Sequence, residues 1–212
     1  MTDLKLTAML CSRLCHDLVG PIGAISNGIE ILEDETDPDM RDQAIGLLAR
    51  SAKQATGRLR FYRLAFGAAG GEEMPVSLAE ARQAAVGMFE DEKADLNWAE
   101  ADGGDPSLGK TAMRLVLNMI LIAGGSLIRG GDLFVRMAPA GDGWRVELTA
   151  SGPTVKVDEQ VVSILRGEQA VDDIETRMVQ PLYTSLLAKA IGSRIDLSQA
   201  GEGRLTMGAA LA

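Results

Sequence analysis

Residues 16–21 read HDLVGP, and this stretch lies inside an amphipathic pattern that covers residues 3–33. Apolar or small side chains recur in the pattern mostly at three- and four-residue steps, the spacing of one face of an α-helix. The stripe consists of Thr7, Leu10, Cys11, Leu14, Leu18, Ile22, Ile25, Ile29 and Leu32. The pattern therefore predicts one long helix over residues 3–33.

A second helix is predicted over residues 38–66. Asp37 followed by Pro38 is a typical helix start, because aspartate caps free backbone N–H groups and proline suits the first helical position. The stripe of this helix consists of Met40, Ala44, Leu47, Ser51, Ala55, Leu59, Tyr62 and Phe66.

Two long helices joined by a short turn form an antiparallel hairpin, which alone leaves apolar surface uncovered. We expect a second copy to cover it, so that a homodimer forms a four-helix bundle.

The pattern changes after a glycine-containing linker at residues 67–71, which predicts two domains, residues 1–70 and 71–212. Helical spacing covers residues 79–89, 107–127, 158–165 and 176–190. Short strand-like segments cover residues 96–99, 133–137, 144–149, 194–198 and 204–208. Helices mixed with adjacent antiparallel strands predict an α+β domain, with its helices on one face of a mixed sheet.

Composition excludes several functional classes. The net charge of −9 disfavours a nucleic-acid partner, since phosphate neutralisation needs clustered basic residues. No stretch is long and apolar enough to span a membrane, and the N-terminus lacks the pattern of a signal peptide. The two cysteines lie four residues apart, which favours a reducing compartment. We therefore expect a cytoplasmic protein with no membrane partner.

The chain contains one histidine, His16. On a helical wheel it lies roughly 170° from the apolar stripe. Ser12, Arg13, Gly20 and Gly23 lie near it, and glycine inside a helix costs about 1 kcal/mol relative to alanine. Such residues are favoured where another molecule must approach closely, which indicates a partner-binding face. A chance surface histidine or a hydrogen-bonded core histidine is the alternative interpretation.

An imidazole on an exposed face is suited to carry a phosphoryl group. Neutral histidine is nucleophilic near pH 7, and its phosphoramidate is labile enough to pass the group to a carboxylate. Asp17, the next residue, could orient the ring or take its proton. His16 and Asp17 are therefore the candidate catalytic residues.

The second predicted helix carries a basic strip. Residues 41–63 contain Arg41, Arg50, Lys53, Arg58, Arg60 and Arg63 against the acid Asp42. Folding the hairpin about residue 35 places residue 54 level with His16, with Lys53, Gly57 and Arg60 nearby. We expect this strip to bind an acidic partner or a phosphoryl group, and a solvated helix face is the alternative.

A metal site built from Cys11, Cys15 and His16 is disfavoured. Tetrahedral zinc needs four ligands, and His16 points away from the side on which the cysteines lie. Both cysteines are interpreted as core residues.

The segment His16-Asp17-Leu18-Val19-Gly20-Pro21 resembles the H-box of sensor histidine kinases, in which proline follows the phosphoacceptor histidine within the first helix of a dimerisation hairpin. The second region resembles the ATP-binding domain of that family, an α/β sandwich of the GHKL (Bergerat-like) type. Residues 113–123 correspond to the N-box, residues 148–153 to the strand and loop that carry the adenine-binding aspartate, and residues 201–211 to the final strands.

The residues that bind nucleotide in those kinases are replaced here. Ile122 stands where the N-box asparagine would hold Mg²⁺, and Ala150 stands where the adenine-binding aspartate would lie. Residues 178–182 lack the glycines of the phosphate-binding lid. The resemblance implies a degenerate domain with no cofactor of its own and no ATP binding, so that Mg²⁺ would enter only with the partner receiver domain.

Over essentially its whole length the chain resembles histidine phosphotransferases, which keep the phosphoacceptor and lack the ATP site. The resemblance implies a dimeric phosphotransferase without ATP-dependent kinase activity. It would accept phosphate on His16 from a receiver aspartate of a hybrid histidine kinase and pass it to response regulators, including the cell-cycle regulator CtrA. A non-catalytic dimeric pseudokinase module that binds or sequesters a response regulator is the alternative.

Overall fold

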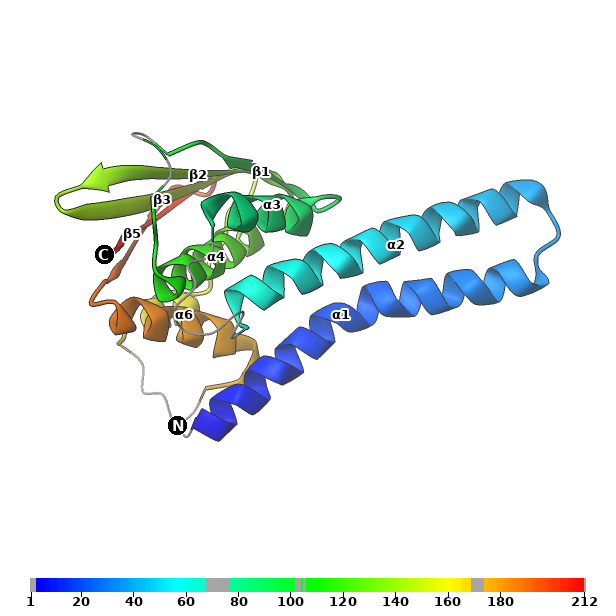
Figure 1. The fold of residues 1–212 in the computed structure, drawn as a ribbon, viewed down its shortest axis with the longest axis horizontal. Coiled ribbons are helices and arrows are strands. Elements are labelled where there is room, and N and C mark those ends of the chain that lie inside the picture. The colour runs from blue at the N-terminus through cyan, green and yellow to red at the C-terminus, as the bar shows by residue number, and fades with distance from the viewer. Residues whose placement is uncertain (1–2, 68–76, 102–103, 105, 169–173, 212) are drawn as a thin grey trace.

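The N-terminal third of the protein is a long helical hairpin (Figure 1), seen in a computed structural model that describes residues 3–67, 77–101, 104, 106–168 and 174–211. Helix α1 (Asp3–Asp34) and helix α2 (Pro38–Ala65) run antiparallel, as predicted. Asp37 caps α2 by accepting a hydrogen bond from the backbone N–H of Asp39 at 2.9 Å, and Pro38 occupies the first turn. Arg41 donates to the carbonyl oxygens of Leu32 and Glu35, which ties the turn to the end of α1.

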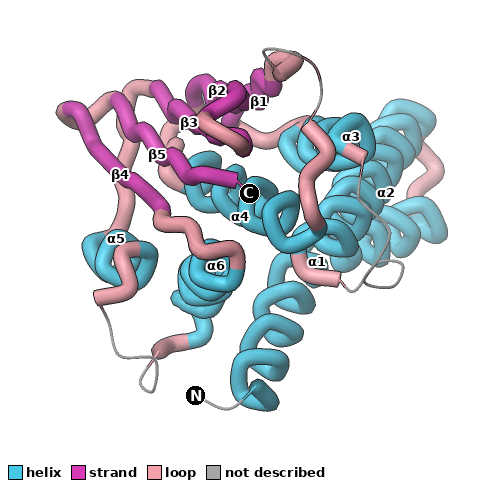
Figure 2. Tube along the Cα trace, turned by 60° about the vertical axis from the view of Figure 1, so that its left-hand side comes forward, coloured by secondary structure: helices cyan, strands magenta, loops and turns pink. Residues whose placement is uncertain are grey.

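The rest of the chain forms a five-stranded mixed sheet with helices on one face (Figure 2). The strands are β1 (Ala94–Trp98), β2 (Gly131–Ala140), β3 (Gly143–Ser151), β4 (Ile195–Ala200) and β5 (Arg204–Leu211). Their order is β1-β2-β3-β5-β4, and the β1–β2 pair is parallel whereas the other pairs are antiparallel. The predicted α+β class and mixed sheet are confirmed.

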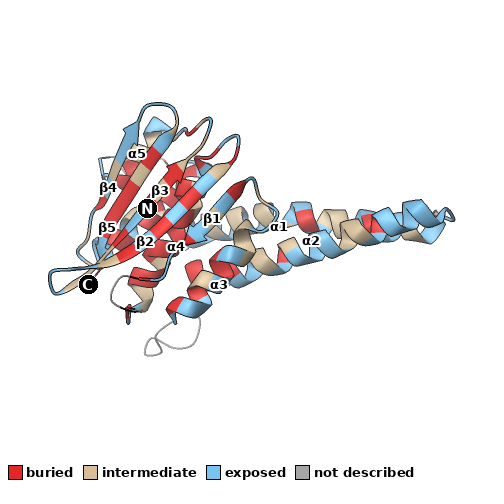
Figure 3. Cartoon of the chain, turned by 90° about the horizontal axis from the view of Figure 1, so that it is seen from above, coloured by how far each residue is buried: buried red, intermediate tan, exposed pale blue. Residues whose placement is uncertain are grey.

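The helices of the second region are α3 (Leu78–Phe89), α4 (Lys110–Gly125), α5 (Glu159–Leu165) and α6 (Val179–Ala190), with a 3₁₀ turn, η2 (Thr176–Met178), before α6. Helix α4 is buried along most of its length, because it packs against β3 and β5 on one side and against α2 and α6 on the other. Its side chains join those of β2, β3 and β5 in the main core, shown as buried in Figure 3. The predicted domain boundary at residues 70–71 lies outside the described residues.

Within one chain, the predicted apolar stripes are only partly buried. Thr7, Cys11, Ile22 and Ile29 are exposed on α1, which instead buries Met9, Pro21 and Gly28. Met40 and Leu59 are likewise exposed on α2. The physical reason is that the N-terminal part of α1 packs against η2 and α6, where Met9 joins a small cluster with Met178 and Leu182, whereas its later part packs against α2. One helix therefore buries two different faces along its length.

No helix among the described residues combines the length and the apolar character that crossing a membrane requires.

Candidate functional site

His16 lies on an open face of α1. Its side chain is 86% exposed, so the prediction that it faces away from the packed side of the helix is confirmed. Gly20 and Gly23 follow on α1, and a Cβ atom added to either glycine would meet nothing within 4 Å. Ser12, one turn before His16, is exposed as well. A partner loop can therefore reach the imidazole over a smooth stretch of helix.

Asp17 connects this face to the rest of the hairpin. One carboxylate oxygen, Oδ1, lies 3.2 Å from Nδ1 of His16. The other, Oδ2, accepts a hydrogen bond from Nε of Arg13 at 2.9 Å and one from the hydroxyl of Tyr62 at 3.0 Å. Arg13, predicted as a partner-binding residue, is thus half-buried and paired with Asp17.

The surroundings of Asp17 keep its carboxylate ionised. Partial burial raises its pKa, but the hydrogen bond and charge of Arg13, with the hydrogen bonds to His16 and Tyr62, outweigh burial and lower the pKa below its usual value. Burial and the charge of Asp17 raise the pKa of Tyr62, so its hydroxyl remains a donor. An ionised Oδ1 favours the tautomer of His16 that carries its proton on Nδ1, and this tautomer leaves the lone pair of Nε2 for a nucleophilic role.

Pro21 changes the hydrogen bonding of the helix just after His16. Proline has no backbone N–H, so the carbonyl oxygen of Asp17, four residues earlier, lacks the usual helical hydrogen bond from position 21. Nη1 of Arg58, from α2, donates to that oxygen. Nη2 of the same guanidinium pairs with Oε1 of Glu92 at 2.9 Å, in the turn between α3 and β1.

Sequence reasoning missed the roles of Tyr62, Arg58 and Glu92. The helical pattern places Tyr62 on the apolar stripe, and it places Arg58 in a basic strip. The missing donor at Pro21 was a usable signal, since a free carbonyl in a packed helix needs a donor from elsewhere. Nothing in the sequence pattern pointed to Glu92, because α3 is placed against α2 only by tertiary packing.

The prediction that residue 54 of α2 lies level with His16 is wrong by one to two turns of helix. Contacts from Arg58 and Tyr62 to Asp17 show that residues 58–62 of α2, and not residue 54, lie level with the start of the H-box. The turn occupies residues 35–37 and α1 bends along its length, with Pro21 inside it (Figure 1), so folding about residue 35 misplaces the register.

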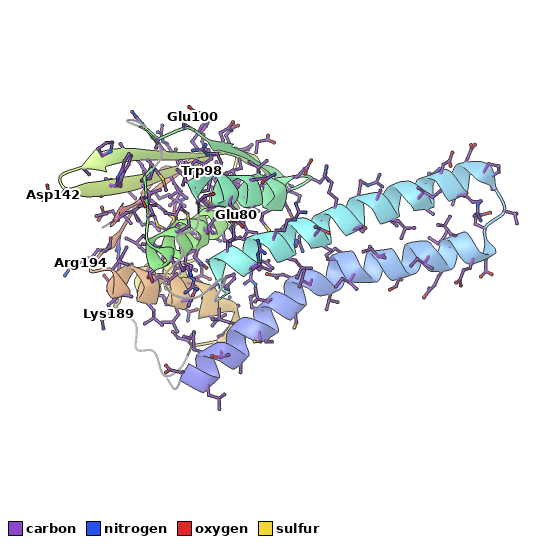
Figure 4. All side chains as sticks on the ribbon, in the orientation of Figure 1. Glu80, Trp98, Glu100, Asp142, Lys189 and Arg194 are labelled. Atoms are coloured by element: carbon purple, nitrogen blue, oxygen red, sulfur yellow. The ribbon has the colours of Figure 1, made fainter. Side chains whose placement is uncertain are left out.

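The predicted basic strip is not a row of free cations. Lys53 forms an ion pair with Glu90, the C-cap residue of α3, and Arg63 pairs with Glu80 of α3 at 3.0 Å (Figure 4 labels Glu80). Arg60 is exposed, and no ion pair to it is formed within the described residues.

Lys53, Gly57 and Arg60 line a groove of about 810 Å³ between α2 and α3, to which no described residue of α1 contributes. Gly57 is a packing residue rather than an open one, because a Cβ atom there would lie 2.3 Å from the carbonyl oxygen of Gly87. Within one chain, these residues are therefore not brought to His16.

The cysteines are also placed differently from the prediction. Cys11 and Cys15 are both exposed on α1 rather than buried in a core. They lie on the side of α1 that carries exposed Ile22 and Ile29, which no part of the described chain covers. Among the described residues, no group of three or more His, Cys, Asp or Glu side chains is arranged to hold a metal ion.

Apolar and amide side chains occupy the positions that the sequence comparison with histidine kinases predicted to replace nucleotide ligands. Ile122 and Ala150 are both buried in the core. Gln180, in the segment predicted to replace the lid, donates from Nε2 to the carbonyl oxygen of Asn118 at 2.9 Å and lies 3.3 Å from Oδ1 of Asn118. Asn118 in turn donates to the carbonyl oxygen of Ala65 at the end of α2. This buried amide cluster joins α2, α4 and α6.

Comparisons with known proteins agree with this architecture. The family model "histidine phosphotransferase C-terminal domain" matches residues 78–203. The protein phosphotransferase ChpT of Brucella abortus (strain 2308) is 37% identical over 202 residues, which are 95% of this chain and 94% of that protein.

Solved structures give the same result. A 1.7 Å structure of a bacterial phosphotransferase aligns with a TM-score of 0.87 and 36% identity, covering 99% of this chain and 97% of the other. Full-length ShkA in complex with AMPPNP aligns with a TM-score of 0.50 and 17% identity, covering 99% of this chain and 46% of that one. At this identity the second likeness concerns the fold alone.

Proposed function

Because the chain belongs to the histidine phosphotransferase family and is a protein phosphotransferase of a phosphorelay, we propose that His16 is the residue that carries the phosphoryl group. The observation that carries this proposal is the geometry of His16, whose ring is exposed while Nδ1 lies 3.2 Å from the carboxylate of Asp17. The arrangement fixes one ring nitrogen and leaves the other for a partner.

The proposed transfer has two steps. Nε2 of His16 attacks the phosphorus of an aspartyl phosphate on a donor receiver domain, forming the N–P bond as the P–O bond breaks and the donor carboxylate leaves. A carboxylate oxygen of an acceptor receiver then attacks the same phosphorus, and the N–P bond breaks. Asp17 accepts the Nδ1–H hydrogen bond and stabilises the positive charge that develops on the ring. Mg²⁺ would be bound by the receiver, not by this chain.

The substitution His16→Gln tests the assignment. It keeps a polar side chain but removes the nucleophilic nitrogen, so incubation with a ³²P-labelled receiver should give no acid-labile label on the variant. Stability should change by less than about 0.5 kcal/mol, because the side chain is exposed. If the variant still accepts label, another residue carries the phosphoryl group. Equal labelling of wild type and His16→Gln would contradict the proposal directly.

The non-catalytic alternative, in which the protein only sequesters a response regulator, makes the opposite prediction. A sequestering module would bind a receiver equally well with His16 or glutamine and would take label in neither case. Membership of a phosphotransferase family disfavours this alternative.

A second copy of the chain is proposed to cover the exposed apolar face of the hairpin. On α1 this face includes Ile22 and Ile29, seven residues apart and 51% and 49% exposed, and on α2 it includes Ile45 and Leu59, 52% and 53% exposed. Figure 3 shows how much of the hairpin is exposed. In a symmetric four-helix bundle, α1 of one copy packs against α2 of the other.

This dimer would place the phosphoacceptor helix of one copy beside Lys53 and Arg60 of the other, because both residues lie next to the Ile45–Leu59 face of α2. The paired substitution Ile22→Glu with Leu59→Glu should dissociate the dimer, as measured by light scattering. A wild-type monomer at micromolar concentration would contradict the dimer proposal.

The second domain is proposed not to bind ATP. Buried Ile122 and Ala150 offer no oxygen ligand, and the amide cluster of Asn118 and Gln180 uses its polar atoms internally. Loss of one buried polar partner alone weakens binding by about 1–3 kcal/mol. Calorimetry should detect no ATP·Mg²⁺ binding, and micromolar affinity would contradict this proposal.

The proposed partners are the receiver domain of a hybrid histidine kinase as donor and response regulators of the CtrA type as acceptors, in the cytoplasm. The open face around Gly20 and Gly23 supports a protein partner with a protruding active-site loop, since no side chain obstructs it. Gly23→Leu, which keeps His16 but fills this space, should slow transfer by weakening receiver binding. An unchanged transfer rate in this variant would place the receiver elsewhere.

A further inference from the structure

We infer that Arg58 is a positioning residue for phosphotransfer, which supplies the hydrogen bond that Pro21 withholds from Asp17 and is itself held by Glu92 of the second domain. The inference deepens the proposed function and rests on it, since it concerns how the His16–Asp17 pair is kept in place. It assigns a mechanical role in the transfer to a domain that has lost its nucleotide ligands.

The first step of the argument is the free carbonyl group. In an unbroken helix the N–H at position 21 would donate to the carbonyl oxygen of Asp17, and proline cannot do so. Nη1 of Arg58 makes this hydrogen bond instead. The residue so fixed is the one whose carboxylate contacts Nδ1 of His16. Arg58 thus holds the main chain of Asp17, while Tyr62 holds its side chain.

The second step is what fixes Arg58. Its Nη2 pairs with Oε1 of Glu92 at 2.9 Å, and Nε2 of Gln54 lies 3.4 Å from the same oxygen. The Arg58 side chain is only 19% exposed, so this ion pair is less screened by solvent than a surface pair. A continuous chain of contacts therefore runs from the second domain, through Glu92 and Arg58, to the backbone beside His16.

A second ion pair between α2 and the second domain provides the comparison. Arg63 pairs with Glu80 at 3.0 Å, close to the length of the Arg58–Glu92 pair, but the two side chains are 63% and 48% exposed. Neither residue contacts the H-box in the described part of the chain. If ion pairs between α2 and the second domain only stabilised the fold, the two pairs would be interchangeable in their effect on transfer.

Three variants separate these roles. Arg58→Met removes the donor and should slow transfer from a phosphorylated receiver to His16 about tenfold, since hydrogen bonds from charged groups are among the stronger ones. Glu92→Gln weakens the hold on Arg58 and should slow transfer about threefold, within the range of partly exposed ion pairs. Glu80→Gln, the matched control, should leave transfer unchanged. Equal slowing by Glu92→Gln and Glu80→Gln would overturn the inference.

A double-mutant cycle with Pro21→Ala gives the decisive test. This substitution supplies an N–H at position 21, which can donate to the carbonyl oxygen of Asp17 and make Arg58 dispensable. In that background Arg58→Met should slow transfer less than about twofold. The reason is that the effects of two substitutions depend on each other when the residues serve the same hydrogen bond, whereas the effects of independent sites add. A penalty of the same size in both backgrounds would overturn the inference.

The same cycle has a readout that needs no receiver. His16 is the one histidine of the chain, so ¹⁵N spectra report its two ring nitrogens without overlap. Arg58→Met should shift the neutral ring away from the Nδ1–H tautomer in the wild-type background and not in the Pro21→Ala background. If wild type takes no label on His16 but this coupling appears, the proposed function fails while the positioning link stands. If wild type is labelled and the coupling is missing, the link fails alone.

Discussion

The hydroxyl of Tyr62 donates a hydrogen bond to Oδ2 of Asp17 across the hairpin, at 3.0 Å. Because Oδ1 of the same carboxylate lies beside Nδ1 of His16, Tyr62 on α2 helps Arg13 to fix the rotation of the side chain that contacts the proposed phosphoacceptor. Tyr62 is buried between Phe61 and Phe66, whose rings lie edge-on to it, so the position of its hydroxyl is fixed by packing.

The substitution Tyr62→Phe should therefore keep the packing and loosen Asp17. We expect a loss of about 1 kcal/mol in the free energy of unfolding, and slower phosphotransfer to His16. Tyr183→Phe is the control, because Tyr183 is partly buried and its hydroxyl interacts with Arg114 instead of Asp17. Urea denaturation and receiver-dependent labelling check both variants. Transfer by Tyr62→Phe at the wild-type rate would show that the hydroxyl only stabilises the hairpin.

The contribution of Asp17 to stability should depend on pH. The pKa of Asp17 in the folded protein is lower than its ordinary value of 3.8, so folding favours the ionised form. Its contribution is fully present above about pH 3.8 and is lost as the pH falls through the lower, folded-state pKa. Wild type should therefore exceed Asp17→Asn in urea midpoint at pH 7, and the difference should shrink in acid. A difference that does not change with pH would contradict the role of the charge.

Gly57 and Gly23 should respond in opposite directions to the same substitution. Gly57→Ala places a methyl group 2.3 Å from the carbonyl oxygen of Gly87 and should destabilise the protein by about 1–3 kcal/mol. Gly23→Ala meets nothing within 4 Å and should stabilise α1 by up to about 1 kcal/mol, the difference in helix propensity. Thermal unfolding of both variants tests the packing of α2 against α3. A stabilising Gly57→Ala would mean that the two helices do not approach so closely.

Charge reversal on α2 should change the rate of encounter with a receiver mainly at Arg60. Lys53 already pairs with Glu90, whereas Arg60 has no ion pair within the described residues, so its charge is more available to an acidic partner. Arg60→Glu should slow association at low ionic strength, and the effect should fade as salt screens the charge. Stopped-flow association rates at several salt concentrations provide the measurement. A rate that does not change at low salt would mean that this part of α2 is an ordinary solvated surface.

The local sequence was sufficient for much of the fold. The period of apolar residues and the Asp37–Pro38 signal placed both long helices to within a few residues, because caps and helical spacing are local properties. The strands were found but shortened, and the helix predicted over residues 107–127 begins only at Lys110. Strand and helix ends depend on which neighbours provide hydrogen bonds, which local patterns do not encode.

The sequence by itself also determined which residue could carry the chemistry, since it contains one histidine and places it opposite the apolar stripe, on the same face as Gly20 and Gly23. Only the tertiary structure decided what surrounds that residue. The free carbonyl group of Asp17 follows from Pro21, but the hydrogen bond to it is donated by Arg58, which lies forty-one residues after Asp17 in the chain. The tertiary structure also paired Lys53 with Glu90 and made Gly57 a packing residue. These relations depend on how α3 packs against α2 and how far the bend in α1 shifts the hairpin register, and the sum of many distant contacts sets both.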